Sequence, residues 1–132
     1  MHVIVCLDNQ NGMLFNRRRQ SRDRAVIADI LQDAKNRTLY ISSFSRDLLP
    51  DATVCPSCPE HAQEDAVYFV EDQPLTPMLH HITKITVYRW NRDYPGDFYL
   101  DIDPLQAGFH VASQTDFPGY SHDKITKEVY VR

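Results

Sequence analysis

Cysteine, glycine and long apolar runs are all scarce in this chain. Three cysteines are an odd number and give no disulfide framework, which favours a reducing, cytoplasmic location. No stretch approaches the roughly 20 apolar residues that a membrane span requires. The N-terminal apolar run, Val3 to Leu7, has no basic region before it and is not typical of a secretory signal. We therefore expect a cytoplasmic protein with no membrane partner.

Excess positive charge is also missing. The formal net charge is −4 at pH 7, which argues against a protein that coats nucleic acid, although a local basic patch can still bind an anion. With 132 residues, 42% of them apolar, the chain is long enough to bury a core. It contains no internal repeat and no linker, so we expect a single domain over residues 1–132.

Apolar patterning predicts an α/β protein. The segment HVIVCLD is apolar at nearly every position, as is typical of a strand buried on both faces. A helix is predicted to begin near Ser21 as its N-cap, with Asp23 in its first turn. Its apolar stripe is predicted to consist of Ile27, Ile30, Leu31 and Ala34. Further strands are predicted at 38–42, 66–71, 82–91, 109–114 and 125–131, which indicates a mixed, mostly parallel sheet with an antiparallel C-terminal hairpin.

Five arginines are concentrated in the segment NRRRQSRDR, residues 16–24. This window carries a charge of +4, so the rest of the chain sums to −8. Arginine stays protonated and offers a planar fork of donors that matches phosphate or carboxylate, and the following helix N-terminus adds free amides. One interpretation is an anion site formed by Asn16, Arg17, Arg18, Arg19 and Arg22. The alternative is a solvated loop whose arginines pair with distant acids, each pair contributing about 0–1 kcal/mol.

Asp8 stands at the end of the first predicted strand. Open α/β sheets gather ligands at the carboxyl ends of their strands. We therefore expect Asp8 and the loop of residues 9–16 to lie beside any site. Asp101 and Asp103 are expected to cap the turn at Pro104 rather than to act as paired catalytic acids. Tyr88 and Trp90, on one face of a late strand, are expected in the core rather than on a stacking surface.

Cys55, Cys58 and His61 form a C-x-x-C-x-x-H pattern. Structural zinc needs four ligands, and no second closely spaced pair follows. We therefore expect no metal site, with two ordinary loop cysteines as the default interpretation. The H-x-H-x-D-H motif of a ribonuclease Z-type enzyme is absent as well, so these residues give no support to that activity.

Three stretches of the chain resemble dihydrofolate reductase. VIVCLDNQNGMLFN is similar to that family's first strand, Asn-Gly turn and active-site loop, and DRAVIADILQDAKNRTLYIS to its first helix and second strand. YPGDFYLDIDPLQAGFHVASQTDF, with the closing ITKEVYVR, resembles its Gly-Asp segment and final hairpin. The resemblance implies a dihydrofolate reductase-like fold, in which Asp23 corresponds to the family's pterin-binding carboxylate and is the candidate catalytic acid.

The departures from that family concern its cofactor. A Gly-Gly pair brings the family's backbone amides close to the dinucleotide phosphates, because only glycine permits that approach. None of the four glycines here is adjacent to another, and none lies between Val70 and Ile82 where the pair would fall. The only tryptophan is Trp90, so the family's loop tryptophan is missing too. These absences argue against conventional NADPH-dependent reductase activity and leave the cofactor, and whether the chain is an enzyme, undetermined.

The leading hypothesis is therefore a protein that binds a small anionic ligand bearing a nucleotide, pterin or phosphate group. The site would lie near the first strand and the arginine run, with Asp8, Asn16, Arg17, Arg18, Arg19 and Arg22 as ligand-binding residues. The alternatives are binding or processing of RNA or single-stranded nucleic acid, and a non-catalytic interaction module.

Overall fold

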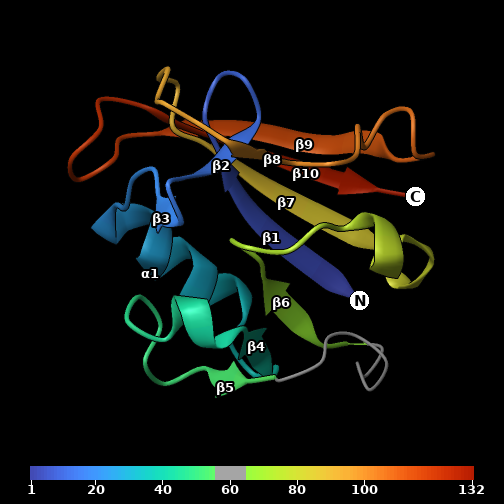
Figure 1. Ribbon diagram of the computed structural model, residues 1–132. Helices are drawn as coiled ribbons and strands as arrows, with labels where there is room; N and C mark the ends of the chain where they lie inside the picture. Colours follow the sequence, from blue (N-terminus) through green and yellow to red (C-terminus); the bar gives the residue numbers. More distant parts are fainter. Residues whose placement is uncertain (56–64) are drawn as a thin grey trace.

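A seven-stranded sheet forms the centre of the computed structural model, which describes residues 1–55 and 65–132. The strand order is β5-β4-β6-β1-β7-β10-β9 (Figure 1). The five strands from β5 to β7 are parallel to their neighbours, and β10 and β9 are added antiparallel. The bounds are β1 His2–Leu7, β4 Leu39–Ile41, β5 Thr53–Val54, β6 Val67–Phe69, β7 Lys84–Arg89, β9 His110–Phe117 and β10 Ile125–Val131. The predicted mixed sheet with an antiparallel C-terminal hairpin is confirmed.

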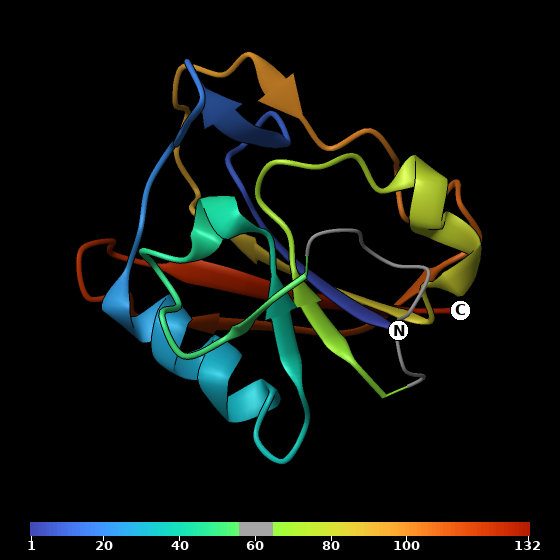
Figure 2. The same cartoon turned by 60° about the horizontal axis from the view of Figure 1, so that its bottom comes forward.

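The first strand, β1, lies between the parallel strands β6 and β7 and is buried on both faces. Val3 and Val5 belong to the core on one face and Ile4 to the core on the other, because side chains alternate along a strand. This explains the nearly continuous apolar run in the sequence. The two termini lie at the same end of the sheet (Figures 1 and 2).

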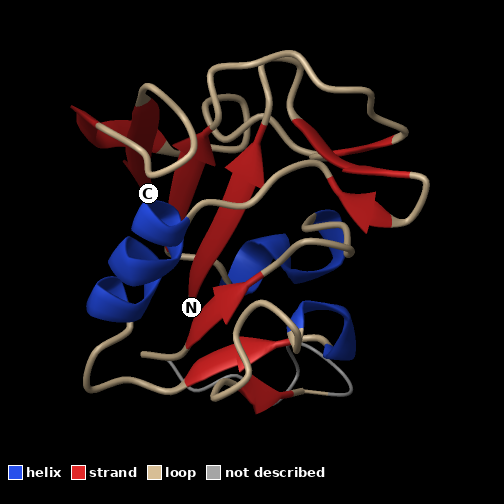
Figure 3. Ribbon diagram, turned by 90° about the vertical axis from the view of Figure 1, so that its left-hand side faces the viewer, coloured by secondary structure: helices blue, strands red, loops and turns tan. Residues whose placement is uncertain are grey.

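Helix α1, Arg24–Asp33, lies along one face of the sheet (Figure 3). The expected start was wrong: Asp23, with extended backbone, is the N-cap, and its side chain accepts from the amide of Ala25. Ser21 lies outside the helix, since a buried carboxylate that accepts several donors is a stronger cap than a serine hydroxyl. Three residues of the predicted stripe face the core, since Ile30 and Ala34 are buried and Ile27 packs against them. Leu31 was wrong, because it is 51% exposed, and Val26 is buried instead.

Two short 3-10 helices, η1 and η2, pack beside the main sheet. η1, Ser43–Ser45, follows β4, and η2, Thr76–His81, contributes Met78 to the core on the face opposite α1. Tyr88 and Trp90 are 0% and 4% exposed, which confirms that this face of β7 belongs to the core. No helix in the described part of the chain is long and apolar enough to cross a bilayer.

A small second sheet has the order β3-β2-β8 and lies beyond the carboxyl end of β1 (Figure 1). Its strands are β2 Gly12–Phe15, β3 Arg18–Arg19 and β8 Phe98–Tyr99. The sequence interpretation assigned these residues to loops, because strands of two to four residues are too short to show a periodic pattern. The arginine run is therefore partly a β-hairpin rather than a free loop.

Candidate functional site at the arginine hairpin

The β2–β3 hairpin fixes the positions of the first three arginines. Leu14 pairs with Arg19 and Phe15 with Arg18, so Asn16 and Arg17 form a two-residue turn. Both have positive φ, 51° and 62°, as the type I′ turn of a tight hairpin requires. The Asn16 amide also donates to the carboxylate of Asp97. The hairpin thus presents Arg17 at its tip and Arg18 and Arg19 on its second strand.

Arg19 is an ion-paired residue. Its Nε donates to Glu71 at 2.8 Å, and its terminal nitrogens hold both carboxylate oxygens of Asp47. The hydrogen bond to Glu71 raises the pKa of Arg19 above its usual value, and burial opposes this only in part. Glu71 is buried and also accepts from the hydroxyl of Ser45. Arg19 therefore joins the hairpin to Asp47, which follows η1, and to Glu71, which follows β6.

Arg18 differs from its neighbour, because it is exposed and has no acidic side chain within salt-bridge distance among the described residues. It lines two cavities, of about 310 Å³ and 300 Å³. Arg17 lines the second cavity and Arg22 lies beyond the hairpin, and in the described part of the chain neither forms an ion pair. The hairpin therefore carries uncompensated positive charge next to two hollows.

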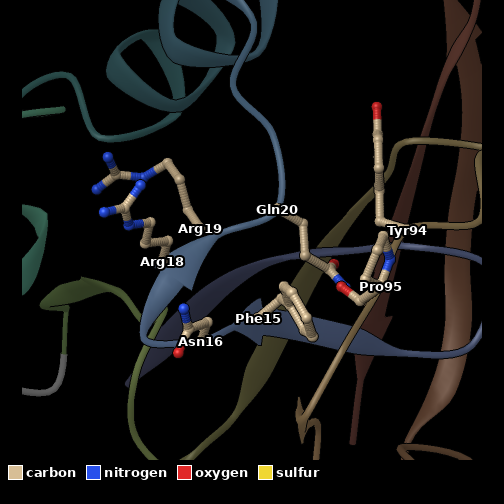
Figure 4. Close-up of a pocket in the computed structure, with 7 residues that line it drawn as sticks. All are labelled: Phe15, Asn16, Arg18, Arg19, Gln20, Tyr94 and Pro95. Carbon is tan, nitrogen blue, oxygen red and sulfur yellow. The ribbon is translucent and has the colours of Figure 1, made fainter.

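The larger cavity has no acidic side chain in its wall. Figure 4 shows the guanidinium groups of Arg18 and Arg19 side by side on one side of the hairpin. Phe15, Gln20, Tyr94 and Pro95 lie on the other side, and Asn16 lies at the turn of the hairpin, next to Arg18 (Figure 4). Phe15 is 48% exposed, so one aromatic ring is open to a ligand. The cavity combines cationic, amide and aromatic groups.

Asp8 is a structural neighbour of this cavity. Its Oδ1 accepts from the amides of Gln10 and Gly12, and its Oδ2 accepts from the amide of Tyr94 and from Nε2 of Gln20. Only 1% of the residue is exposed. Asp8 thus ties the end of β1 to Gln20 and Tyr94, two wall residues, while its carboxylate is already surrounded by donors. The Oε1 atom of Gln20 is buried and has no hydrogen-bond partner in the described structure.

Asp23 lies apart from the arginine cavities, and its carboxylate is fully engaged. Oδ1 accepts from the amides of Ala25 and Tyr120, and Oδ2 accepts from the amide of Ser121 at 2.8 Å and from Nδ1 of His122 at 2.8 Å. Burial alone would raise the pKa of Asp23, but the bonds from His122 and the backbone amides outweigh it and hold the pKa below its usual value. The resemblance gave no hint of His122.

The remaining sequence candidates have structural roles or lie outside the described residues. Asp103 accepts from the amide of Leu105 and caps the turn at Pro104, as expected. Asp101 instead accepts from the amides of Leu75 and Thr76, at the start of η2. Cys55 is described and forms no disulfide, whereas Cys58 and His61 fall within residues 56–64 and are not described. No metal-ligating cluster occurs within residues 1–55 and 65–132.

Three residues of the site were not found by sequence reasoning: Gln20, Asp47 and Glu71. They come from separate elements and meet only in the folded chain. Asp47 and Glu71 are 28 and 52 positions from Arg19, and a charge pattern within one short window gives no sign of such distant partners. The only signal in the sequence was the charge of −8 outside residues 16–24, which implies that acidic side chains elsewhere in the chain can pair with the arginines.

No protein-family model matches the chain, and no curated protein matches it in sequence. A solved structure does match in fold: dihydrofolate reductase from Enterococcus faecalis, complexed with NADP(H) and RAB-propyl. The TM-score is 0.73 and the match covers 99% of this chain and 95% of that chain, at 11% sequence identity. An identity this low carries the fold and not the activity. The chain therefore has a divergent dihydrofolate reductase-like fold.

Proposed function

We propose that the protein binds a small anionic ligand at the arginine hairpin, with the anion held by Arg18 and a planar group against Phe15 and Tyr94. A phosphate-bearing ligand such as a mononucleotide has this combination of charge and ring. The observation that carries the proposal is that Arg18 lines both cavities and has no acidic partner in the described structure. Arg17, at the tip of the hairpin, and the Asn16 side chain would assist it.

The charge of the cavity supports an anion. Arg19 has two carboxylates as partners, so it contributes little net charge, whereas Arg18 contributes a full one. An arginine fork gives bidentate hydrogen bonds to phosphate or carboxylate, and these are among the stronger hydrogen bonds in proteins. The orphaned Oε1 of Gln20, a wall residue, is an acceptor for a ligand amine or hydroxyl.

A dinucleotide does not fit the residues that are present. The segment between β6 and β7 contains no glycine, and its helix is the six-residue 3-10 helix η2. The amides of Leu75 and Thr76, at the start of η2, are held by the carboxylate of Asp101. The carboxylate occupies the amide donors that a pyrophosphate would need, and its negative charge would repel the negative charge of the pyrophosphate. We therefore propose that NADPH is not a ligand and that conventional reductase chemistry is not the function.

Thermal denaturation with a ligand panel tests the proposal. The panel is inorganic phosphate, adenosine 5′-monophosphate, folate, NADPH and a short single-stranded RNA. A ligand present at about 100 times its Kd stabilises the native state by roughly 2.7 kcal/mol, which raises Tm by several degrees. We expect the mononucleotide to raise Tm, Arg18→Gln to remove the effect, and Arg37→Gln to preserve it. Arg37 is an exposed arginine beyond the far end of α1 and makes a matched control.

The other outcomes are decisive as well. If the mononucleotide raises the Tm of Arg18→Gln as much as that of the wild type, Arg18 is not part of the site. If NADPH raises the Tm of the wild type, the proposal that NADPH is not a ligand is wrong. If the RNA binds instead, affinity should fall steeply and log-linearly with salt, as expected for contacts to a phosphate backbone. A small anion in a partly enclosed pocket depends on salt far less.

A further inference from the structure

A chain of hydrogen bonds joins the buried carboxylate of Asp23, the N-cap of α1, to His122 and then to Ser21. Nδ1 of His122 lies 2.8 Å from Oδ2 of Asp23, and Nε2 of the same ring lies 2.9 Å from Oγ of Ser21. We propose that Ser21 is a nucleophile and that the protein hydrolyses carboxylic esters with a small acyl group. Apart from Tyr94, which also lines the cavity at Arg18, the proposal uses different side chains from those that hold the anion.

The geometry of the Asp23–His122–Ser21 hydrogen bonds shows which of these groups donates to which. The Asp23 carboxylate is completely buried and is ionised because five donors surround it, so it accepts the proton of Nδ1. When the ring of His122 is neutral, its Nε2 carries the lone pair. That lone pair faces the hydroxyl of Ser21, as a general base must face a nucleophile. An aspartate that fixes the tautomer and orientation of the histidine is the third member of a catalytic triad.

Tyr94 completes the arrangement. Its hydroxyl lies 3.4 Å from Oγ of Ser21 and donates toward it, and it lies 3.2 Å from Nε2 of His122. A phenol donor next to the nucleophile is suited to stabilising the negative oxygen that develops on an attacked carbonyl. The Trp90 ring stacks on the imidazole, with ring centroids 4.8 Å apart and planes 24° apart. Its π face stabilises the imidazolium that forms when His122 takes the proton.

The size of the pocket beside Ser21 limits the acyl group of the substrate. A narrow pocket of about 10 Å³ is bounded by Ser21 and Trp90 together with the apolar groups of Cys6, Val26, Ile27 and Phe69. A space of about one water-sized probe accepts an acetyl methyl group but no long acyl chain. Ser21 itself is only half-buried, so the leaving group of an ester can extend into solvent. The fitting substrate is an acetate ester.

The chemical steps balance without a cofactor. Oγ of Ser21 bonds to the acyl carbon while its proton passes to Nε2 of His122. The carbon–oxygen bond of the ester then breaks, and the leaving alcohol takes the proton from the imidazolium. A water molecule, deprotonated by His122, attacks the acyl-serine and releases the carboxylic acid together with free Ser21. Asp23 is a positioning residue throughout and touches no reacting atom.

Covalent labelling and hydrolysis test the proposal on the full chain. Phenylmethanesulfonyl fluoride should modify Ser21, as located by peptide mapping, and p-nitrophenyl acetate should be hydrolysed above the rate in buffer. Ser21→Ala should remove the label and reduce the enzymatic rate about 100-fold or more. Ser113→Ala should change neither, because Ser113 is an exposed serine on β9.

A second variant covers the case in which Ser21→Ala fails to fold. His122→Gln keeps an N–H donor for Asp23 but has no basic nitrogen facing Ser21, so it should also lose both label and hydrolysis. Circular dichroism establishes that each variant is folded. Sulfonylation of another residue, or hydrolysis that persists in either folded variant, would overturn the assignment. If Ser21 is not a nucleophile, the rise in Tm that the mononucleotide causes through Arg18 is still expected, since Ser21 does not line that cavity.

Discussion

The carboxylate of Asp23 and the imidazole of His122 are hydrogen-bonded at 2.8 Å although 99 positions separate them in the sequence. The first residue caps helix α1, and the second belongs to the connection between β9 and β10. The same carboxylate accepts the amides of Tyr120 and Ser121. One buried side chain therefore joins the only α-helix of the described structure to the C-terminal hairpin.

Replacing Asp23 by alanine should destabilise the fold strongly. The change removes a helix cap, which costs about 1 kcal/mol, and leaves several buried donors without an acceptor. We expect a loss of about 3 kcal/mol or more in the free energy of unfolding, measured by urea denaturation. Asp93→Ala is the matched control, because Asp93 is exposed. Equal stability of the two variants would contradict the role assigned to Asp23.

Stability should fall between pH 7 and pH 3 because of His2. Burial lowers the pKa of His2 to about 3, and the charges of Lys84, Arg37 and Lys127 add to this effect. Between that value and the ordinary 6.5 the unfolded chain binds a proton that the folded chain does not, so stability is full above pH 6.5 and declines as the pH falls. The contribution is on the order of 5 kcal/mol. Urea midpoints of His2→Gln should vary less with pH than those of the wild type, while His110→Gln, at an exposed position, should follow the wild type.

The strand and helix layout could be predicted because each main element carries a local pattern. β1 is apolar at nearly every position, and β10 begins and ends at the predicted residues, Ile125 and Val131. Where local patterns were weak the prediction was wrong. β2, β3, β5 and β8 have two to four residues each, and the start of α1 depends on a cap whose strength comes from the distant residues Tyr120 to His122.

The candidate site was predictable only in part, for the same physical reason. The arginine cluster is visible within nine residues of sequence, and its position beyond the first strand follows from the α/β pattern. The sequence does not show which arginine is neutralised, because Arg19 pairs with Asp47 and Glu71 across the fold whereas Arg18 lines the cavities without an ion pair among the described residues. Single-sequence charge patterns describe neighbours along the chain, and ion pairs join neighbours in space.

Substitution of Arg19 should destabilise the protein, in contrast to substitution of Arg18. Arg19→Gln leaves the buried carboxylate of Glu71 without its cationic partner, which costs about 3 kcal/mol. Arg18→Gln, at an exposed position, should change the free energy of unfolding by less than about 0.5 kcal/mol. Chemical denaturation of both variants measures the difference. Equal losses would show that the two arginines are equivalent, against the ion pairs described above.

The hairpin turn should be stabilised by glycine at position 17. Arg17 has a φ of 62°, in a region that is costly for residues with a side chain, and Asn-Gly is the preferred pair for a type I′ turn. We expect Arg17→Gly to raise the free energy of unfolding by about 0.5–1 kcal/mol. Thermal denaturation measures this. A destabilised variant would mean that the Arg17 side chain makes contacts worth more than the backbone strain.

Residue-resolved mapping of the ligand is the most direct test of the anion site. The measurement is an NMR titration of the nitrogen-labelled chain with adenosine 5′-monophosphate, following the backbone amides and the arginine side chains. We expect the shifted resonances to cluster at residues 15–20 and at Tyr94, and to be lost in Arg18→Gln. Shifts centred on Leu75 and Thr76, or none at saturating nucleotide, would contradict a site at the arginine hairpin.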